Sequence, residues 1–325
     1  AGTAGGSLKA LFEVRDGDNL ENFKGKVTKA DSYSLTVENI SIDNIKSLNL
    51  PDKDGKITVN NISYSYDSWE AQVDAQGNIK SVTFNLSKDK AIADPEKTVA
   101  EGYLLNAGSA INARGIPYYM TQLNEFVRNF SEMFNQIESK GQNLNGDTPP
   151  TFFEAITNTA KVYDFSESEA YSKLPDGQTA TINSSSNTYY RMTAANFSVN
   201  KDVMNDVSLF ATSTDYVKTD SCDIVDELKK LQSEKTVYRG DKAESFLETI
   251  ISNVSVDTEK AETYNKLYSN LEQTIANQRT SVSGVDEDEE ALNLVKFQYS
   301  YNMASKIISV MNQMLDKLIN DTGVA

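Results

Sequence analysis

A heptad series of apolar residues near the end of the chain limits the possible folds more than any other feature. Steps of alternately three and four residues, starting from Leu294, meet an apolar or aromatic side chain every time. The positions, called here the terminal stripe, are Leu294, Phe297, Tyr301, Ala304, Ile308, Met311, Leu315 and Leu318. This spacing places them on one side of a helix, as in the seam of a coiled coil. At about 1.5 Å per residue, a helix over 286–320 would be roughly 50 Å long, more than one short partner helix can cover.

The beginning of this helix is also marked. Ser283-Gly284-Val285 interrupts the preceding helical pattern, and Asp286 is suited to cap the first turn. The acidic run 287–290 suits the positive end of the helix dipole. A divalent cation bound to this run is the alternative, but neighbouring carboxylates on a helix point in different directions and the spacing of a calcium loop is absent. The sequence therefore favours a capped helix.

The terminal stripe has two candidate partners. A second heptad pattern covers 247–282, directly before the Ser-Gly break, and would pack against the stripe within one chain. The other candidate is a neighbouring subunit, in which case the stripe is a surface for polymerisation and chaperone binding. The sequence leaves both open.

Composition excludes several classes of function. The 325 residues include 31 Lys+Arg and 47 Asp+Glu, a net charge of −16, so we expect the surface to repel nucleic acid and acidic membranes. Histidine is absent and Cys222 is the single cysteine, which removes His-based catalysis, the commonest zinc ligands and any internal disulfide. The sequence has no apolar run long enough for membrane insertion. We expect no cofactor and no metal.

Residues 20–113 have the sequence pattern of an antiparallel β domain. Alternation with period two predicts strands at 33–37, 57–59, 63–66, 71–73 and 79–84. Turns are predicted at 52–55 and 74–78. The first turn is not a calcium loop, because Leu50 and Asn61 stand where ligands would be needed. Trp69 is predicted to lie in the core of the domain.

Helical patterns flank this domain. Residues 7–15 and 116–137 carry apolar residues at steps of three and four, and Pro117 suits a first helical turn. Because the cost of loop closure grows slowly with length, a folded module whose ends meet can be inserted between two helical pieces. A short helix around Ile224 and Leu231 comes later in the chain.

The predicted fold class is mixed and multidomain, an elongated α-helical bundle or coiled-coil rod carrying inserted antiparallel β-rich domains. The predicted segments are a first rod piece (1–19), the inserted β domain (20–113), a second rod piece (114–146), an irregular β-leaning excursion (147–202) and a C-terminal helical rod (203–325) that includes the coiled-coil helix 286–320.

Several stretches resemble one family. They are 277–285 (NQRTSVSGV), 288–291 (DEEA), Phe297-Gln298, Tyr301, Ala304, Ile307 and Ile308, with 5–13, 116–145 and 193–199 in the same order upstream. These resemble the flagellar hook-associated protein 1 family, the proteins of the hook–filament junction. The Ser-Val-Ser-Gly-Val stretch before the terminal helix is more specific for this family than the helix itself, because hook and rod proteins have similar terminal helices. The family's N-terminal helix, which pairs with the C-terminal one, has no counterpart here. The resemblance therefore implies a C-terminal portion of a longer protein, with 20–113 as an insertion.

The resemblance also implies a function. It predicts a structural subunit, not an enzyme, that is exported without a cleaved signal peptide and polymerises outside the cell, in the flagellum. Its implied partners are further copies of itself, hook protein, a second junction protein (hook-associated protein 3) and an export chaperone on the terminal helix. The terminal stripe would be the assembly interface.

Three other functions are weighed against this one. A hook- or rod-type axial protein shares the terminal helix. Residues 20–113 are suited by their Tyr, Asn and Ser content to be a surface binding or adhesion module, although a passive spacer is favoured. A glycosidase needs only two carboxylates, but no spacing in the sequence singles out a pair.

Overall fold

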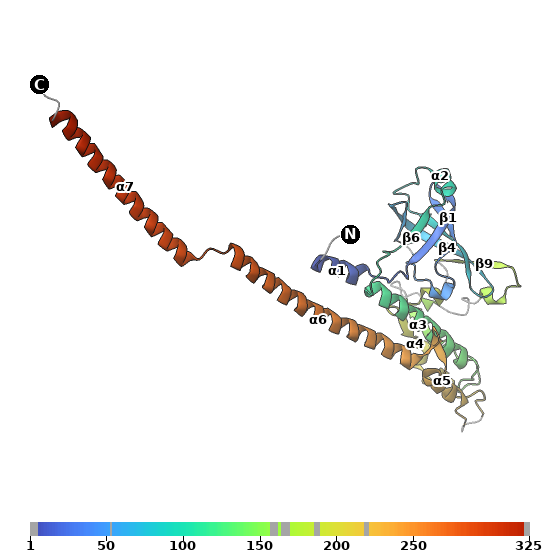
Figure 1. Cartoon of the computed structure of the whole chain (residues 1–325). Coiled ribbons are helices and arrows are strands. Elements are labelled where there is room, and N and C mark those ends of the chain that lie inside the picture. Colours follow the sequence, from blue (N-terminus) through green and yellow to red (C-terminus); the bar gives the residue numbers. More distant parts are fainter. Residues whose placement is uncertain are drawn as a thin grey trace. The chain divides into compact units, whose positions relative to one another are not determined.

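The computed structural model describes residues 6–52, 54–156, 162–163, 170–184, 189–217 and 221–321. Parts of the predicted excursion 147–202 therefore lie outside the described residues. The chain divides into two compact units, Ala1–Ile251 and Ser252–Ala325, with the division inside a long helix. The first unit combines an antiparallel β structure with helices, and the second is helical (Figure 1). The fold is thus mixed, as the sequence predicts.

A closed antiparallel barrel dominates the first unit. Its strands are β1 (Phe23–Asp31), β2 (Ser34–Glu38), β3 (Gly55–Val59), β4 (Ile62–Asp74), β5 (Ile79–Leu86) and β6 (Leu104–Ala107), in the order β3-β6-β1-β2-β5-β4. Strand β4 closes the barrel because it pairs with β3 along its first half and with β5 along its second half. Strand β9 (Thr179–Asn183) adds to the second half of β4, so the sheet recruits a strand from outside 20–113.

The barrel core is built from alternate residues of these strands. In β3 the buried residues alternate with more exposed ones, as expected for a strand with one face inward. Trp69 is fully buried, which confirms its predicted place in the core, and its indole N–H donates to the Pro51 carbonyl at 3.0 Å. The strands predicted separately at 63–66 and 71–73 are one continuous strand, since Tyr66, Trp69 and Ala71 all enter the same core. A register shift between Tyr66 and Ser68 keeps both halves facing inward.

The two ends of the barrel segment meet beside the helices α1 (Ser7–Asp16) and α3 (Ile116–Glu138). The Gly115 amide donates to the Gly17 carbonyl at 3.0 Å, and the Asn19 amide donates to the Ala113 carbonyl at 2.9 Å. A Cβ atom on Gly17 or Gly115 would lie 2.3 Å from the Glu13 carbonyl, so only glycine allows this close approach. The two ends of segment 20–113 therefore lie side by side in the structure.

One face of α3 is bonded to the barrel through the 3₁₀ turn η1 (Ile45–Ser47) and the loop after it. Arg128, which is 1% exposed, donates to the carbonyls of Met192, Lys46 and Leu48 at 2.8 to 3.0 Å and to Asn49 Oδ1 at 2.5 Å. One turn away on either side, Glu132 accepts from Lys46 and Glu125 accepts from Ser47. This set of contacts, the α3–barrel interface, fixes the barrel on the helix.

The remaining elements of the first unit are short. They are α2 (Pro95–Ala100), β7 (Phe153–Ile156), β8 (Val162–Tyr163), η3 (Ala170–Lys173), η4 (Tyr189–Arg191), β10 (Phe197–Val199), α4 (Lys201–Asn205), η5 (Val207–Leu209), α5 (Asp223–Ser233), β11 (Thr236–Tyr238) and β12 (Asp241–Lys242). Strands β10, β7 and β8 form a small antiparallel sheet, and β11 pairs with β12. A second core joins α3, α5, the β11–β12 hairpin and the start of the following long helix through Phe126, Leu231, Val237 and Phe246.

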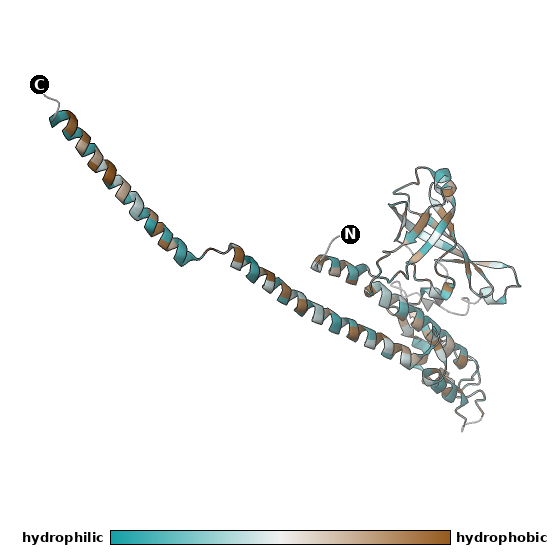
Figure 2. Ribbon diagram, in the orientation of Figure 1, coloured by the Kyte–Doolittle hydropathy of each residue, from teal (hydrophilic) through white to brown (hydrophobic). Residues whose placement is uncertain are grey.

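Two long helices end the chain. Helix α6 (Ala243–Ser283) has 41 residues and α7 (Glu287–Asp321) has 35. The predicted break at Ser283-Gly284-Val285 is confirmed, and α7 lies within one residue of the predicted 286–320. Apolar residues recur along both helices (Figure 2). Ala243 and Phe246 are the buried residues of α6, both in its first turn, and α7 has none.

Candidate assembly interface

Helix α7 carries all eight predicted interface residues on one side. An uninterrupted helix over 287–321 turns about 100° per residue, which keeps the three- and four-residue steps of the terminal stripe together. The large members are half to three-quarters exposed, from Leu315 at 50% to Phe297 at 75%, and Ala304 is exposed as well. The structure therefore brings the predicted residues together and leaves them open to solvent.

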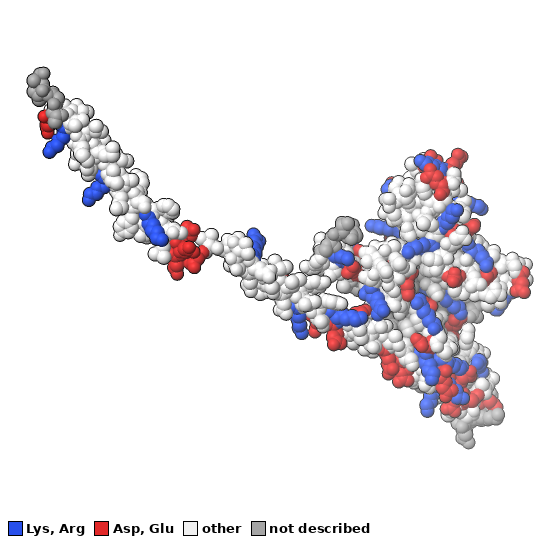
Figure 3. Space-filling view, in the orientation of Figure 1, with Lys and Arg blue, Asp and Glu red and all other residues white. Residues whose placement is uncertain are grey.

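The start of α7 follows the sequence prediction. Asp286 accepts hydrogen bonds through Oδ1 from the amides of Asp288 at 3.0 Å and Glu289 at 3.3 Å, which is the geometry of an N-cap. Four acidic residues occupy the first turn and form a concentrated patch of negative charge (Figure 3). No group of three or more Cys, Asp or Glu side chains suited to hold a metal ion exists among the described residues.

The intramolecular partner considered above does not cover the stripe. Helix α6 has its own exposed apolar residues over the predicted 247–282, among them Tyr264 at 56%, Tyr268 at 64% and Leu271 at 50%. Two helices packed along their stripes would bury these side chains to the level seen in the barrel core. The exposure of both helices does not support packing of α7 along α6 within one chain, and that interpretation stays a prediction.

Helix α7 has a second apolar stripe that sequence analysis missed. Its members are Leu292, Val295, Tyr299, Met303, Ile307, Val310 and Met314, and all are between 43% and 69% exposed. At about 100° per residue this second stripe lies roughly 130° around the helix from the terminal stripe. Steps of 3, 4, 4, 4, 3 and 4 residues from Leu292, which are not strictly alternating, reveal it in the sequence. Polar residues such as Ser305 and Ser309 fill the wider face between the two stripes.

Two separate apolar stripes mean that α7 can contact two partners at once. Complete burial of one large aliphatic or aromatic side chain contributes about 1.5–3 kcal/mol. Covering the terminal stripe would contribute on the order of 10 kcal/mol before the entropic costs of association. Soluble monomers rarely leave so much contiguous apolar surface open, so this helix has the character of an interface. Among the described helices, none has the length and apolar content to cross a membrane.

Comparisons with known proteins point to the same segment. The family model described as "Flagellar basal body rod FlgEFG protein C-terminal" matches residues 276–321, which comprise the end of α6 and all of α7. An exposed two-stripe helix in a segment of this kind supports a flagellar structural component, and this similarity also favours a structural over a catalytic role.

A second comparison is more particular. Flagellar hook-associated protein 1 of Bacillus subtilis (strain 168) is 24% identical to this chain over 215 residues, which is 64% of the chain. The two similarities together support a flagellar hook-associated protein. The aligned part spans 36% of that relative's length. No solved structure matches the chain significantly.

Proposed function

We propose that this chain is a structural subunit of the bacterial flagellum that joins hook to filament, and that it assembles by helical self-association through α7. One observation carries the proposal: the terminal stripe is open along its whole length, and it lies within the segment that resembles flagellar rod proteins. The similarity to a hook-associated protein 1 supports the junction, rather than another part of the axis, as the place of assembly.

The two stripes suggest how α7 would be covered. A helix inside a polymer of identical subunits has neighbours on more than one side, and each stripe would face a different neighbour. The partners proposed on this basis are further copies of the chain, hook protein on one side and hook-associated protein 3 on the other. Before assembly, an export chaperone would cover α7, because an open stripe of this length favours aggregation. The assembled protein would lie outside the cell.

The proposal is tested by assembly in cells. The wild-type protein and a variant that lacks 286–325 are expressed in a strain without the native gene, and filaments on hooks are counted by electron microscopy. We expect hooks without filaments for the deletion. Normal filaments on the truncated protein would overturn the proposal. A finer pair is Ile308→Asp, within the terminal stripe, against Ser309→Asp, on the polar face, with loss of filaments expected only for the first.

A hook- or rod-type axial protein is the second candidate, supported by the match of 276–321 to a rod-protein model. The two candidates differ in where the protein lies. Immunogold labelling of purified flagella places a junction protein at one band between hook and filament, and places a rod or hook protein along the rod or along the length of the hook.

A further inference from the structure

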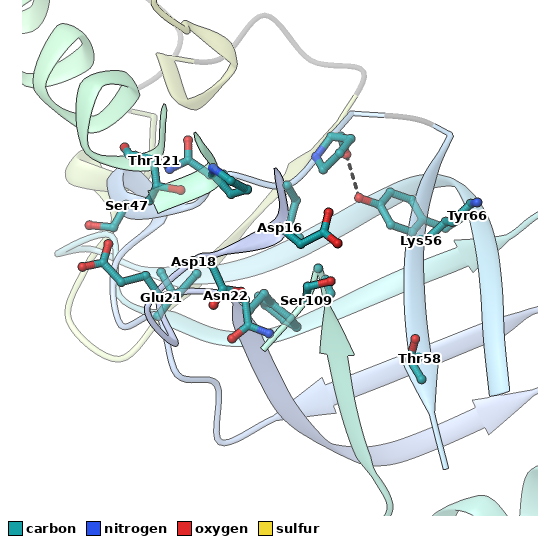
Figure 4. A pocket seen from close by; sticks show the side chains of 18 of the residues that line it. Asp16, Asp18, Glu21, Asn22, Ser47, Lys56, Thr58, Tyr66, Ser109 and Thr121 are labelled. Carbon is teal, nitrogen blue, oxygen red and sulfur yellow. Dashed lines mark hydrogen bonds between the residues drawn. The ribbon is translucent and has the colours of Figure 1, made fainter. Parts of the chain in front are cut away.

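A cavity of about 510 Å³ lies where the barrel meets the linker from α1 and the start of α3. Its walls combine side chains of that linker, such as Asp18 and Asn22, with Ser109 after β6 and with apolar residues at the barrel mouth, such as Tyr66 and Leu50 (Figure 4). The volume is within the roughly 300–1,000 Å³ of small-molecule sites. Apolar atoms form most of the accessible wall, and more than half of the residues that line it are polar or charged. The cavity is remote in sequence from α7, and the assembly function does not use it.

Two polar side chains of this cavity lack partners. Asn22 is 9% exposed, and neither its amide nitrogen nor its amide oxygen has a hydrogen-bond partner. Asp18 is 5% exposed; its Oδ1 accepts from the Leu20 amide at 2.9 Å, and its Oδ2 has no partner. Buried polar groups without partners are rare in folded proteins because each costs about 1–3 kcal/mol.

The backbone holds these side chains at the cavity. Asn19 and Leu20, between them in sequence, have φ angles of 50° and 64°, a left-handed conformation that a leucine rarely adopts. Strain of this kind persists where the surrounding structure imposes it, and it is common at ligand sites. Burial also raises the pKa of Asp18 above that of an exposed aspartate.

Charge in the cavity identifies the class of ligand. The other two carboxylates are already paired: Arg15 bonds Asp16, and Arg239 lies 3.1 Å from Glu21. Lys56 also lines the cavity, and the charge of Lys24 acts on Asp18, but among the described residues no cation forms an ion pair with Asp18 and no cluster is suited to a metal ion. The buried groups without a hydrogen-bond partner are one acceptor on Asp18 and one donor with one acceptor on Asn22. A molecule with adjacent hydroxyl groups satisfies all three without adding charge.

We propose that this cavity binds a small neutral polyhydroxyl ligand of monosaccharide size, held by Asp18 and Asn22. Asp18 Oδ2 and the amide of Asn22 are closed to solvent in the unliganded chain. On binding, these side chains turn toward the cavity, a ring hydroxyl donates to Asp18 Oδ2, and a vicinal hydroxyl bonds the amide of Asn22. The apolar residues of the barrel mouth contact the hydrophobic face of the ring. A carbohydrate-binding barrel on a flagellar surface would give the inserted domain a role of its own, separate from assembly.

The test uses the full chain and a defined set of probes. Saturation-transfer NMR and titration calorimetry are run with D-glucose, D-galactose, N-acetyl-D-glucosamine and glycerol as neutral probes and with putrescine as a cationic probe. The variants are Asn22→Leu, Asp18→Asn, which keeps an acceptor for the Leu20 amide, and Asn145→Leu as a matched control on an exposed loop. Thermal unfolding shows that each variant is folded.

We expect at least one neutral probe to bind with a Kd of about 1 mM or tighter. Asn22→Leu and Asp18→Asn should each weaken binding about tenfold or more, and Asn145→Leu should leave it unchanged. Because leucine removes the unpaired amide, Asn22→Leu should also unfold at an equal or higher temperature in the absence of probe. Binding of putrescine alone, binding that survives both cavity variants, or no binding of any neutral probe would overturn the proposal, the last result leaving water as the partner of these groups.

Discussion

Helices α3 and α7 are both long and amphipathic, but they find their partners in different places. One face of α3 is covered within the chain, and its contacts are specific: Arg128 meets three carbonyls and an amide oxygen, each at a fixed position. Along α7 the two stripes contain generic apolar side chains that remain open. Specific polar contacts such as those of Arg128 suit a single permanent partner. Apolar stripes such as those of α7 suit contact with repeated copies of the chain. The difference separates the part of the chain that folds from the part that assembles.

The largest expected effect is on assembly. Ile308→Asp places a charge at the centre of the terminal stripe, and a charge buried without a partner at an interface costs several kcal/mol. We expect filament assembly to be lost, while unfolding of the first unit, followed by the fluorescence of Trp69 (the only tryptophan), stays unchanged. Ser309→Asp adds the same charge beside it and should leave assembly intact. Equal loss for both variants would mean that charge on α7, and not its apolar stripe, is what matters.

The second effect is on folding. Arg128→Met removes the buried guanidinium and leaves the carbonyls of the α3–barrel interface without a donor. We expect the free energy of unfolding to fall by about 3–5 kcal/mol in urea titrations, with Trp69 as the reporter. Arg279→Met, on the exposed part of α6, is the matched control and should change stability by less than about 0.5 kcal/mol. A loss below about 1 kcal/mol for Arg128→Met would contradict the view that this interface fixes the barrel on α3.

The third effect depends on pH. Glu138, at the end of α3, is 2% exposed, and burial raises its pKa to about 7 although the Ala211 amide donates to its Oε1. The folded state therefore holds a proton that the unfolded state releases near its ordinary pKa of 4.5. The stability from this group is complete below pH 4.5 and is lost as the pH rises towards 7, by up to about 3 kcal/mol.

Glu138→Gln tests this pH dependence directly. Glutamine keeps the acceptor for the Ala211 amide and cannot ionise. We therefore expect the free energy of unfolding in urea to be higher for the variant than for wild type above pH 7, and not to decline between pH 4.5 and 7. Identical pH profiles for the two proteins would show that Glu138 keeps an ordinary pKa in the folded state.

The smallest effect is local. Asp286→Ala removes the cap of α7 and should destabilise its first turn by about 1 kcal/mol. Amide exchange at 287–290 in the isolated chain should become severalfold faster, while exchange in the barrel stays the same. Asp316→Ala, near the other end of the same helix, is the control. An unchanged rate at 287–290 would show that the acidic first turn is ordered without its cap.

Sequence analysis predicted the elements that depend on local periodicity. The starts and ends of α3 and α7, the break at Gly284 and the burial of Trp69 all follow from spacing, capping and turn residues. The terminal stripe was found for the same reason. The domain limits set from the sequence remain a prediction, because β9 pairs with the barrel from the later part of the chain and the compact units divide within α6.

Features that depend on distant contacts were not predictable. Arg128 bonds residues about 80 positions earlier in the chain, and β9 pairs with β4 more than a hundred residues away, so neither leaves a periodic signal. The unpaired groups of Asp18 and Asn22 become visible only when the cavity around them is formed. The second stripe on α7 is different, because apolar residues at steps of three and four from Leu292 mark it in the sequence. The single heptad frame that starts at Leu294 does not include these residues.

Amide hydrogen exchange of 287–321 tests the central claim most directly, namely that α7 is open in the single chain and covered in the assembly. It is measured by mass spectrometry on the isolated chain and on the same chain in purified flagella. We predict rapid exchange in the isolated chain, because a solvated helix of this length without tertiary packing is marginally stable, and strong protection in the assembled state. Protection already present in the isolated chain, or rapid exchange that persists in flagella, would contradict this account.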